Sequence, residues 1–445
     1  MLDRMPTPGK ENRVKITQDD GTVIEGVMEY ADGAVQQGSA YIKGNVLPDD
    51  VCGLLSIDSV TSEPKDAFVR LGLVNAEVYG GIMISLVGDG SAVDGVTFTL
   101  GGSVYTTDDR GRAFITKPAG NYTALFSNTL DLTFVPSSLK VESVKGQIRS
   151  YTVQATASPE NQKIITQSTI VALSSRVADF DIFCVGGGGS GAAVALMDIN
   201  SRYYEYRAGA TGGAGGRTST KTGIKNSGQA VQIVIGAGGS RVTASLSGTM
   251  VSQDQAVSGN SGGETYASIG GSKVCSALGG AGGKVGADRE SRGIYLNGSD
   301  GGSGSGCVYA DSTINQTVGA TNSGADGANG LDYGSVKGGV GQGTTTKPFE
   351  ETGTSYSPAG AGCALQSNGK TVDGSPGANG GSSKSSVSSG TTSIATASIG
   401  TVGGAGGGAA LAAIRNTASI GSASVWAESS AGVSGLAIIR WRYAS

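Results

Sequence analysis

The chain has 445 residues, of which 77 are glycine, and its formal net charge is −4. It contains no histidine, which excludes Ser-His-Asp and Cys-His catalysis and removes the commonest protein ligand for metal ions. The acidic balance removes the electrostatic case for nucleic-acid binding, because that binding favours clustered Lys and Arg. We therefore expect no metal, no other cofactor and no nucleic-acid partner.

The first residues lack the pattern of a signal peptide. Residues 1–6 carry no basic stretch followed by a long apolar run, and no 18-residue apolar run occurs in the sequence. We therefore expect a chain that is made in a cytoplasm and does not insert into a membrane.

The five cysteines are widely scattered and form no C-x-x-C pair; they are Cys52, Cys184, Cys275, Cys307 and Cys363. An odd, unpaired set argues against a disulfide framework and against a zinc site. Unpaired cysteine behaves as a small apolar residue, so we expect buried free thiols.

A small domain with β-structure is predicted for residues 1–78. Residues 14–17 and 22–25 flank an Asp-Gly pair, which is a strong signal for a β-hairpin. The segments 7–14 and 45–51 resemble the N-terminal segments of structural proteins from phages and prophages of Gram-positive bacteria. That resemblance implies a domain for attachment or assembly, with other tail or baseplate proteins as partners.

A β-sandwich is predicted for residues 79–157. Short β-rich runs separated by Gly, Asp and Pro are typical of this fold; they cover residues 82–87, 96–100, 113–116 and 122–126. The stretches 105–114 and 118–122 resemble the carboxypeptidase-regulatory or prealbumin-like sandwich, a spacer in many surface proteins. The resemblance concerns a fold and implies no activity.

The composition changes near residue 180. Residues 1–180 contain 18 glycines, whereas residues 181–445 contain 59. No glycine lies between Gly146 and Gly186, and the Ser-Pro-Glu-Asn-Gln sequence at 158–162 indicates a linker or turn in that gap. We place the last domain boundary there and assign residues 158–445 to a third, glycine-rich domain.

Glycine recurs at every third residue in six segments of the third domain. Three residues make one turn of a polyproline-type helix, so this spacing gives the helix a face without side chains. Such a helix has no internal hydrogen bonds, and its buried backbone groups need partners on neighbouring segments. We therefore expect β-strands together with packed polyglycine II-type helices in a mainly β protein. The proposed scaffold glycines are Gly186, Gly188, Gly212, Gly215, Gly280, Gly283, Gly327, Gly377, Gly403 and Gly406.

Two other interpretations of the glycine pattern are weaker. Collagen needs long Gly-X-Y runs rich in proline, whereas these runs last two to four triplets and residues 181–445 contain three prolines. A disordered Gly/Ser linker is disfavoured because predicted strands bracket the region.

Three strand segments introduce and close the glycine-rich region. Residues 180–185 run into Gly-Gly-Gly-Gly-Ser-Gly, residues 231–235 run into Gly-Ala-Gly-Gly, and residues 435–441 end the region. In this order, across residues 165–445, they resemble the glycine-rich domain of phage tail fibres and adhesins. The resemblance implies a distal adhesin on the virion tail, whose loops bind a host surface polysaccharide or protein. A homo-oligomer such as a trimer is also expected, because tail fibres gain avidity in that way.

Two nucleotide-binding motifs are imitated in the glycine-rich region. Gly186, Gly188 and Gly191 fit G-x-G-x-x-G after a strand, but no helical pattern follows that glycine does not interrupt. The sequence Gly-Lys-Thr at 369–371 lacks the first glycine of a P-loop, because residue 364 is alanine.

Aromatic residues between the glycine runs are the candidate receptor contacts. Tyrosine in a loop offers a large amphipathic contact area at small entropic cost. Alternatively, these rings fill gaps that glycine leaves. Trp441, on the closing strand, is expected in the core. The candidates are Arg202, Tyr203, Tyr204, Tyr206, Tyr295, Tyr309, Tyr333, Phe349 and Tyr356.

Binding rather than catalysis is the predicted activity. The alternatives are a passive tail or virion protein without receptor binding, and a polyglycine ice-binding protein that would present a flat face of small residues. A tail depolymerase with paired carboxylates would also need no histidine.

Overall fold

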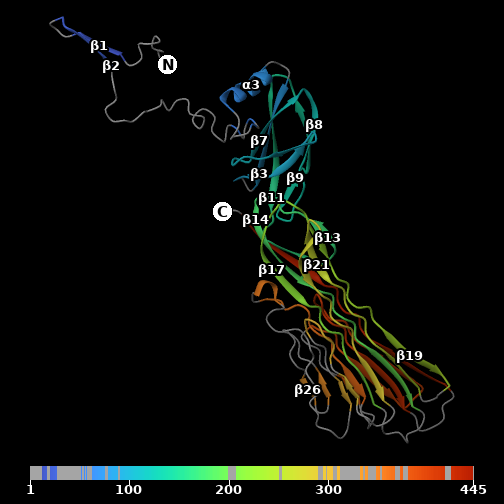
Figure 1. The fold of residues 1–445 in the computed structure, drawn as a ribbon. Coiled ribbons are helices and arrows are strands. Elements are labelled where there is room, and N and C mark those ends of the chain that lie inside the picture. Colours follow the sequence, from blue (N-terminus) through green and yellow to red (C-terminus); the bar gives the residue numbers. More distant parts are fainter. Residues whose placement is uncertain are drawn as a thin grey trace. The chain divides into compact units, whose positions relative to one another are not determined.

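The computed structural model describes residues 13–17, 21–27, 52, 55, 57, 63–75, 79–88, 91–198, 207–249, 253–288, 294–296, 298–303, 308–310, 331–333, 336–338, 347–350, 353–365, 371–373, 379–415 and 422–443. Strands dominate these residues, so the predicted mainly β class is confirmed (Figure 1). No helix in these ranges is long and apolar enough to cross a membrane.

Two compact units can be distinguished in the chain. One comprises Met1–Ser85, Arg112–Tyr122 and Val141–Tyr151, and the other comprises Leu86–Gly111, Thr123–Lys140 and Thr152–Ser445. Strands β3, β8, β10 and β11 contribute residues to both units. The domain boundaries at residues 78 and 157 stay predictions.

The predicted N-terminal hairpin is present. Strand β1 (Arg13–Thr17) pairs antiparallel with β2 (Val23–Val27). Gly21 lies in the turn with φ of 81°, a left-handed conformation that glycine adopts without strain. Farther along the same unit, helix α3 (Pro64–Asn75) packs Ala67 against Cys52, Leu55 and Phe114.

Residues 79–157 form two sheets that pack face to face, as the sequence predicts. One has the strand order β4-β3-β11-β9 with β7 on β3, and the other has the order β10-β8-β5-β6. Phe126 stacks on Phe98 of one sheet, with centroids 5.0 Å apart, and contacts Phe134 of the other at 5.7 Å. The strands are β3 (Tyr79–Gly88), β4 (Ser91–Ala92), β5 (Thr97–Leu100), β6 (Ser103–Thr106), β7 (Arg112–Pro118), β8 (Gly120–Leu125), β9 (Leu132–Val135), β10 (Ser138–Ser143) and β11 (Ile148–Ala157).

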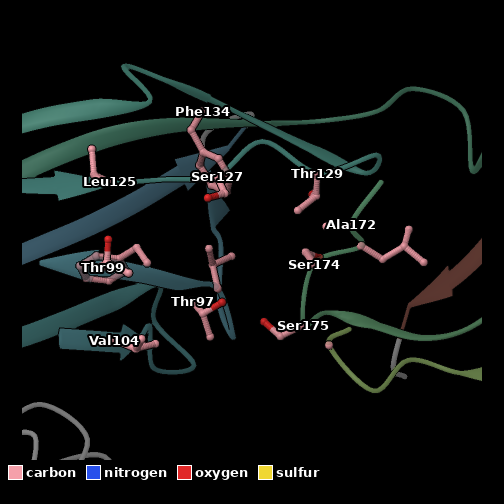
Figure 2. Close-up of a pocket in the computed structure, with 14 residues that line it drawn as sticks. Thr97, Thr99, Val104, Leu125, Ser127, Thr129, Phe134, Ala172, Ser174 and Ser175 are labelled. Carbon is pink, nitrogen blue, oxygen red and sulfur yellow. The ribbon is translucent and has the colours of Figure 1, made fainter. Parts of the chain in front are cut away.

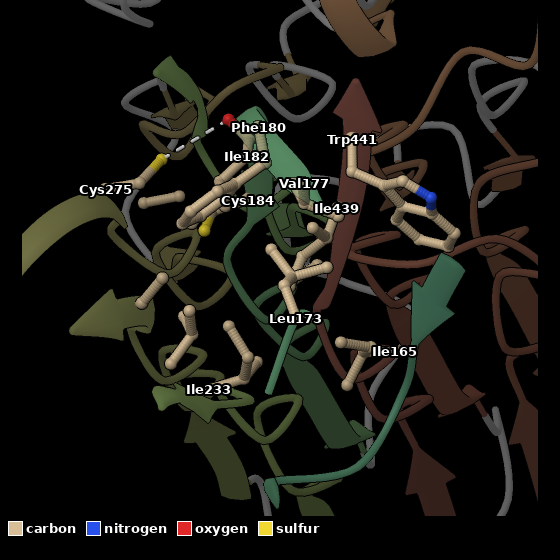
Figure 3. Packing of buried hydrophobic residues seen from close by; sticks show 14 residues of the cluster. Ile165, Leu173, Val177, Phe180, Ile182, Cys184, Ile233, Cys275, Ile439 and Trp441 are labelled. Carbon is tan, nitrogen blue, oxygen red and sulfur yellow. Dashed lines mark hydrogen bonds between the residues drawn. The ribbon is translucent and has the colours of Figure 1, made fainter. Parts of the chain in front are cut away.

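The glycine-rich region opens with two four-stranded sheets. Their orders are β12-β34-β14-β17 and β13-β18-β21-β22. The sheets enclose an apolar core that includes Phe180, Ile439 and Trp441, which is 1% exposed (Figure 3). Trp441 is therefore a core residue, as predicted. The strands are β12 (Gln162–Ile165), β13 (Thr169–Val171), β14 (Val177–Val185), β17 (Thr218–Lys225), β18 (Val231–Val234), β21 (Thr265–Ile269), β22 (Ser272–Ala277) and β34 (Leu436–Tyr443).

A second set of sheets has cores made largely of alanine. Their orders are β20-β15-β32-β30, β23-β16-β28-β29 and β19-β33-β31. These strands are β15 (Ala193–Asp198), β16 (Arg207–Ala210), β19 (Thr243–Gly248), β20 (Gln253–Val257), β23 (Val285–Asp288), β28 (Cys363–Leu365), β29 (Thr371–Asp373), β30 (Lys384–Ser388), β31 (Thr392–Thr396), β32 (Ala410–Arg415) and β33 (Ala423–Glu428). Two short pairs, β24 (Ile294–Leu296) with β25 (Val308–Ala310) and β26 (Leu331–Tyr333) with β27 (Val336–Gly338), and the helical turn η3 (Pro348–Glu350) complete the region.

Glycine-rich passages connect the two sets of sheets. Each passage leaves a strand of one set and enters a strand of the other, and it has neither helix nor strand of its own. Six such passages cover residues 186–192, 211–217, 235–242, 258–264, 278–284 and 429–435. A further segment, 405–409, enters β32. Together these passages form a bundle that separates the two sets of sheets.

Candidate functional site

The central passage of the bundle donates hydrogen bonds with a period of three. Its six consecutive N–H groups, from Gly186 to Gly191, donate hydrogen bonds to carbonyls of three neighbouring passages in turn, with N···O distances of 2.9–3.1 Å. The acceptors, in order, are the carbonyls of Arg217, Gly263, Val433, Ala214, Asn260 and Ser430. A helix with three residues per turn points successive N–H groups in three directions. The predicted polyglycine II geometry accounts for this pattern.

The carbonyl groups of the same passage accept hydrogen bonds from three further segments. Gly280 and Gly283 donate to the carbonyls of Gly187 and Ser190, with N···O distances of 2.9 and 2.8 Å. The carbonyls of Gly188 and Gly189 accept from Gly239 and Gly407, each at 2.8 Å. The central passage thus has six hydrogen-bonded neighbours, and most of its buried backbone groups are paired outside the passage.

Most of the proposed scaffold glycines lie where backbones meet. A Cβ atom added at Gly188 would collide with the carbonyl of Ala405, and one at Gly406 would collide with the carbonyl of Gly213. Backbone would also obstruct a Cβ at Gly186, Gly212, Gly215, Gly280 and Gly283, whereas at Gly403 the obstacle is the Leu436 side chain. Gly327 and Gly377 lie outside the described residues.

Ser190 is the exception in the central passage. Its side chain is fully buried, and its Oγ accepts a hydrogen bond from the N–H of Asn260, with an N···O distance of 2.8 Å. The neighbouring glycines have no space for a side chain, but this position holds one that ties two passages together.

The strand registers gather several chain connections at one edge of the second set of sheets. Asp198 is paired with Arg415 in the parallel pair of β15 and β32, and Met197 is paired with Gln253 of β20. Gly248 lies opposite Ala423, and Arg207 lies opposite Asp288. These pairings bring together the strand ends that bound connections 199–206, 249–252, 289–293 and 416–421. We call this edge the loop edge.

Only some of the tyrosines proposed as receptor contacts lie within the described residues. Arg202, Tyr203, Tyr204 and Tyr206 lie outside the described residues, in the connection from β15 to β16. Tyr295 and Tyr309 are paired residues of β24 and β25, and Tyr333 ends β26. The role of these tyrosines stays a prediction.

Phe349 and Tyr356 are placed differently. Both are 9% exposed and lie in one apolar cluster around Phe183, whose ring centroid is 6.3 Å from that of Phe349 and 6.0 Å from that of Tyr356. The Arg440 guanidinium lies over the Phe349 ring, 4.3 Å from its centroid. Their burial leaves little ring area for a receptor, so the gap-filling interpretation fits these two residues better.

A charge network around the buried Asp181, on β14 and β34, was not predicted. Asp181 accepts hydrogen bonds from Arg442, with N···O distances of 2.6 and 2.8 Å, and from Arg440 at 3.2 Å. The Arg442 hydrogen bonds, helped by the Gly223 N–H, lower the pKa of Asp181 to about 2 against the effect of burial. The available signal was two alternate acidic residues, Asp179 and Asp181, on the opening strand, with the alternate arginines Arg440 and Arg442 on the closing strand.

Four of the cysteines are buried free thiols, as expected, and Cys307 lies outside the described residues. Cys184 and Cys275 both belong to the core in Figure 3. Interaction with the Cys184 thiol lowers the pKa of Cys275, while burial opposes this shift. Across the described residues, no group of three or more Cys, Asp or Glu side chains could hold a metal ion.

A cavity of about 440 Å³ lies apart from the loop edge (Figure 2). Its lining includes Phe98, Leu125 and Phe134 from the sandwich, together with Leu173 and Ser174 from the segment after β13. Serine and threonine hydroxyls are present, but no ionisable side chain lines the cavity. It therefore offers no group for acid–base chemistry.

Comparisons with known proteins gave one family match and a distant structural similarity. A streptococcal ancillary pilin of known structure is similar over 45% of this chain and 59% of the pilin, with 14% identity and a TM-score of 0.19. The match thus spans less than two thirds of the pilin. No curated protein matches the chain. The family model of the glycine-rich domain matches residues 165–442, which is more than half of the chain. The chain therefore belongs to the glycine-rich domain family.

Proposed function

We propose that this protein is a receptor-binding protein of a phage tail, in which the connections at the loop edge bind a bacterial surface polysaccharide or protein. One observation carries the proposal: a bundle of mutually hydrogen-bonded passages ends in sheets whose registers gather four connections at one edge. Binding residues are often found on loops that a rigid scaffold positions. Membership of the glycine-rich domain family and the resemblance to tail adhesins agree with this role.

The other regions have supporting roles in this proposal. Residues 1–78 attach the chain to other tail or baseplate proteins, and the sandwich is a spacer. The protein is a homo-oligomer on the virion tail, where several weak contacts add to a larger avidity. Its activity is binding without turnover.

The position of the polyglycine passages favours receptor binding over ice binding. An ice-binding protein would present the small residues of such helices on an outer face. Residues 186–191 and 211–216 are instead buried, and their backbone groups bond to neighbouring passages. These two central passages therefore suit a scaffold better than a contact surface.

A cell-attachment assay tests the proposal. Fluorescently labelled full chain is mixed with a panel of Gram-positive strains and with phage-resistant mutants of any strain that it binds. We expect binding to particular strains and loss of binding to their resistant mutants. Failure to bind any strain from which a phage carrying this protein can be propagated would contradict the proposal.

The first substitutions to test are in the tyrosines of the connection that precedes β16. Replacing Tyr203, Tyr204 and Tyr206 together by alanine should lower cell attachment about tenfold or more, because aromatic anchors dominate many interfaces. Tyr122→Ala in the sandwich is the control and should leave attachment unchanged. If the triple variant is folded and attaches normally, this connection is not part of the site.

A further inference from the structure

The outer face of the sheet β19-β33-β31 is a regular array of side chains. Residues alternate between the two faces of a strand, and the registers place nine outward residues in three rows. The rows are Thr243-Glu428-Thr396, Ser245-Trp426-Ile394 and Ser247-Ser424-Thr392. The opposite face is buried and packs Ala244, Val425 and Ala395 into an apolar cluster.

Trp426 occupies the middle of this array. It lies on the central strand and is 44% exposed, beside Ile394, which is 60% exposed. The other tryptophan, Trp441, is 1% exposed. Burial within this chain therefore does not account for an indole at the centre of the face. Exposed aromatic residues with polar surroundings often mark binding sites.

Hydroxyl groups flank the indole along and across the strands. Ser245 lies beside Trp426 on β19, and the two outer rows provide Ser247, Ser424, Thr392, Thr243 and Thr396. Neighbouring strands are about 4.8 Å apart and the rows about 7 Å apart. Each hydroxyl can donate one hydrogen bond and accept others, so the face can satisfy ligand groups of either kind.

The array carries no net charge. Its one ionisable side chain, Glu428, forms an ion pair with Arg241, with an N···O distance of 2.5 Å. A neutral face with an exposed indole and many hydroxyls complements an uncharged, polyhydroxylated ligand. The two large apolar side chains are few for a protein partner, because a stable interface buries about 800 Å² on each side.

We propose that this face binds an uncharged polysaccharide. One pyranose ring places its C–H face on the indole of Trp426, and the hydroxyls of adjacent sugar units exchange hydrogen bonds with the serine and threonine rows. The inference rests on the proposed function and deepens it: the surface receptor is then a neutral glycan chain, and the contact includes a strand face besides the loop edge.

Tryptophan fluorescence provides a direct test. The chain has two tryptophans, and Trp441 is shielded, so quenching by acrylamide reports mainly on Trp426. The probes are purified neutral wall polysaccharide and purified teichoic acid from the Gram-positive strains of the attachment panel. We expect the neutral polymer to protect Trp426 from quenching and teichoic acid to have no effect.

Substitutions distinguish the contribution of the indole to binding from the contributions of its neighbours. In calorimetric titration with the neutral polymer, Trp426→Ala should weaken binding about tenfold or more, which corresponds to roughly 1.4 kcal/mol. Trp426→Phe, which keeps a flat ring, should lose much less. Ile394→Ser should weaken binding, whereas Ile170→Ser, at an equally exposed site on β13, should not. Circular dichroism checks that each variant is folded.

Three outcomes would overturn the inference. Trp426→Ala could bind the neutral polymer as tightly as wild type does, or teichoic acid could protect Trp426 from quenching as well as the neutral polymer does. In the third outcome, raising the protein concentration without any polymer would protect Trp426. The last would assign the face to contact between copies of the chain. Whole-cell attachment separates the two proposals. If wild type and Trp426→Ala attach equally, only the glycan face fails; if wild type attaches to no strain, the proposed function fails, and the polymer titration still tests the face.

Discussion

The sandwich and the glycine-rich bundle build their interiors from different parts of the chain. In the sandwich, the interior consists of side chains such as Phe98, Phe126 and Phe134, and the hydrophobic effect favours their burial. In the bundle, the interior consists of backbone, whose N–H and C=O groups bond between passages. The first interior can adjust by changing rotamers. The second has few and small side chains, so it cannot adjust in this way, and we expect it to tolerate substitution far less.

The largest effect is expected from one added methyl group in the bundle. Gly188→Ala places its Cβ against the carbonyl of Ala405, and the backbone must move apart. We expect a loss of about 4–5 kcal/mol in the free energy of unfolding of the glycine-rich region. Tryptophan fluorescence during denaturation measures it, because both tryptophans lie in that region.

Gly228→Ala is the matched control for that substitution. Gly228 has a φ of 73° and open space around it, so alanine there should cost only about 1–2 kcal/mol for the left-handed backbone. Equal losses in the two variants would mean that conformational freedom, and not close approach, is what the bundle needs from glycine.

The stability of the sandwich should depend on the volume of its buried side chains. Phe126→Ala removes a buried ring between the two sheets and should cost about 3–4 kcal/mol, whereas Phe126→Leu should cost less than about 1.5 kcal/mol. Calorimetric unfolding of the full chain provides the comparison. If leucine is as damaging as alanine, the sandwich is as intolerant as the bundle and the contrast between the two regions disappears.

The charge network gives the glycine-rich region a predictable response to acid. The folded pKa of Asp181 is about 2, while an unfolded aspartate titrates near 4. Its contribution to stability is therefore complete above about pH 4 and is lost as the pH falls through 2. Asp181→Asn should lower stability at pH 7 by about 2 kcal/mol and flatten the acid side of the stability profile.

Lys225→Ala provides the control for the charge network. Lys225 lies 3.4 Å from Asp179, but its side chain is 83% exposed, so we expect a change below about 0.5 kcal/mol. An unchanged acid profile in Asp181→Asn would show that other carboxylates dominate that pH range.

Apart from the controls, the smallest effect is expected at Ser190 in the central passage. Ser190→Ala keeps the Cβ but removes the oxygen that accepts from Asn260, which should cost about 1 kcal/mol. Chemical denaturation measures the difference from Gly188→Ala, two residues earlier. Equal losses at both positions would contradict the idea that only particular positions in the passage touch backbone.

Local features of the glycine-rich region could be predicted from sequence. The strands at 180–185 and 231–235 and the closing strand with buried Trp441 each depend on short apolar runs beside glycine. The triplet spacing likewise indicated helices with three residues per turn. These signals are local because hydropathy and glycine spacing act over a few residues.

The arrangement of the passages and of the loop edge could not be predicted. Backbone hydrogen bonds leave no side-chain signature, so nothing in the sequence pairs Gly188 with Val433. The loop edge depends on the parallel pairing of β15 with β32, which lie far apart in the chain. Trp426 was missed because its strand alternates apolar inner residues with polar outer ones, and one exposed indole does not disturb that pattern.

The long-range pairing of the central passage has a consequence for synthesis and folding. Gly188 and Gly191 donate to Val433 and Ser430, and β14 pairs with β34, so the first passage obtains these partners only after the last has been made. Interactions with such large sequence separation slow folding, because a long loop must close before any contact forms. During translation β14 can pair with β17 early, but its pairing with β34 must wait until almost the whole region has left the ribosome.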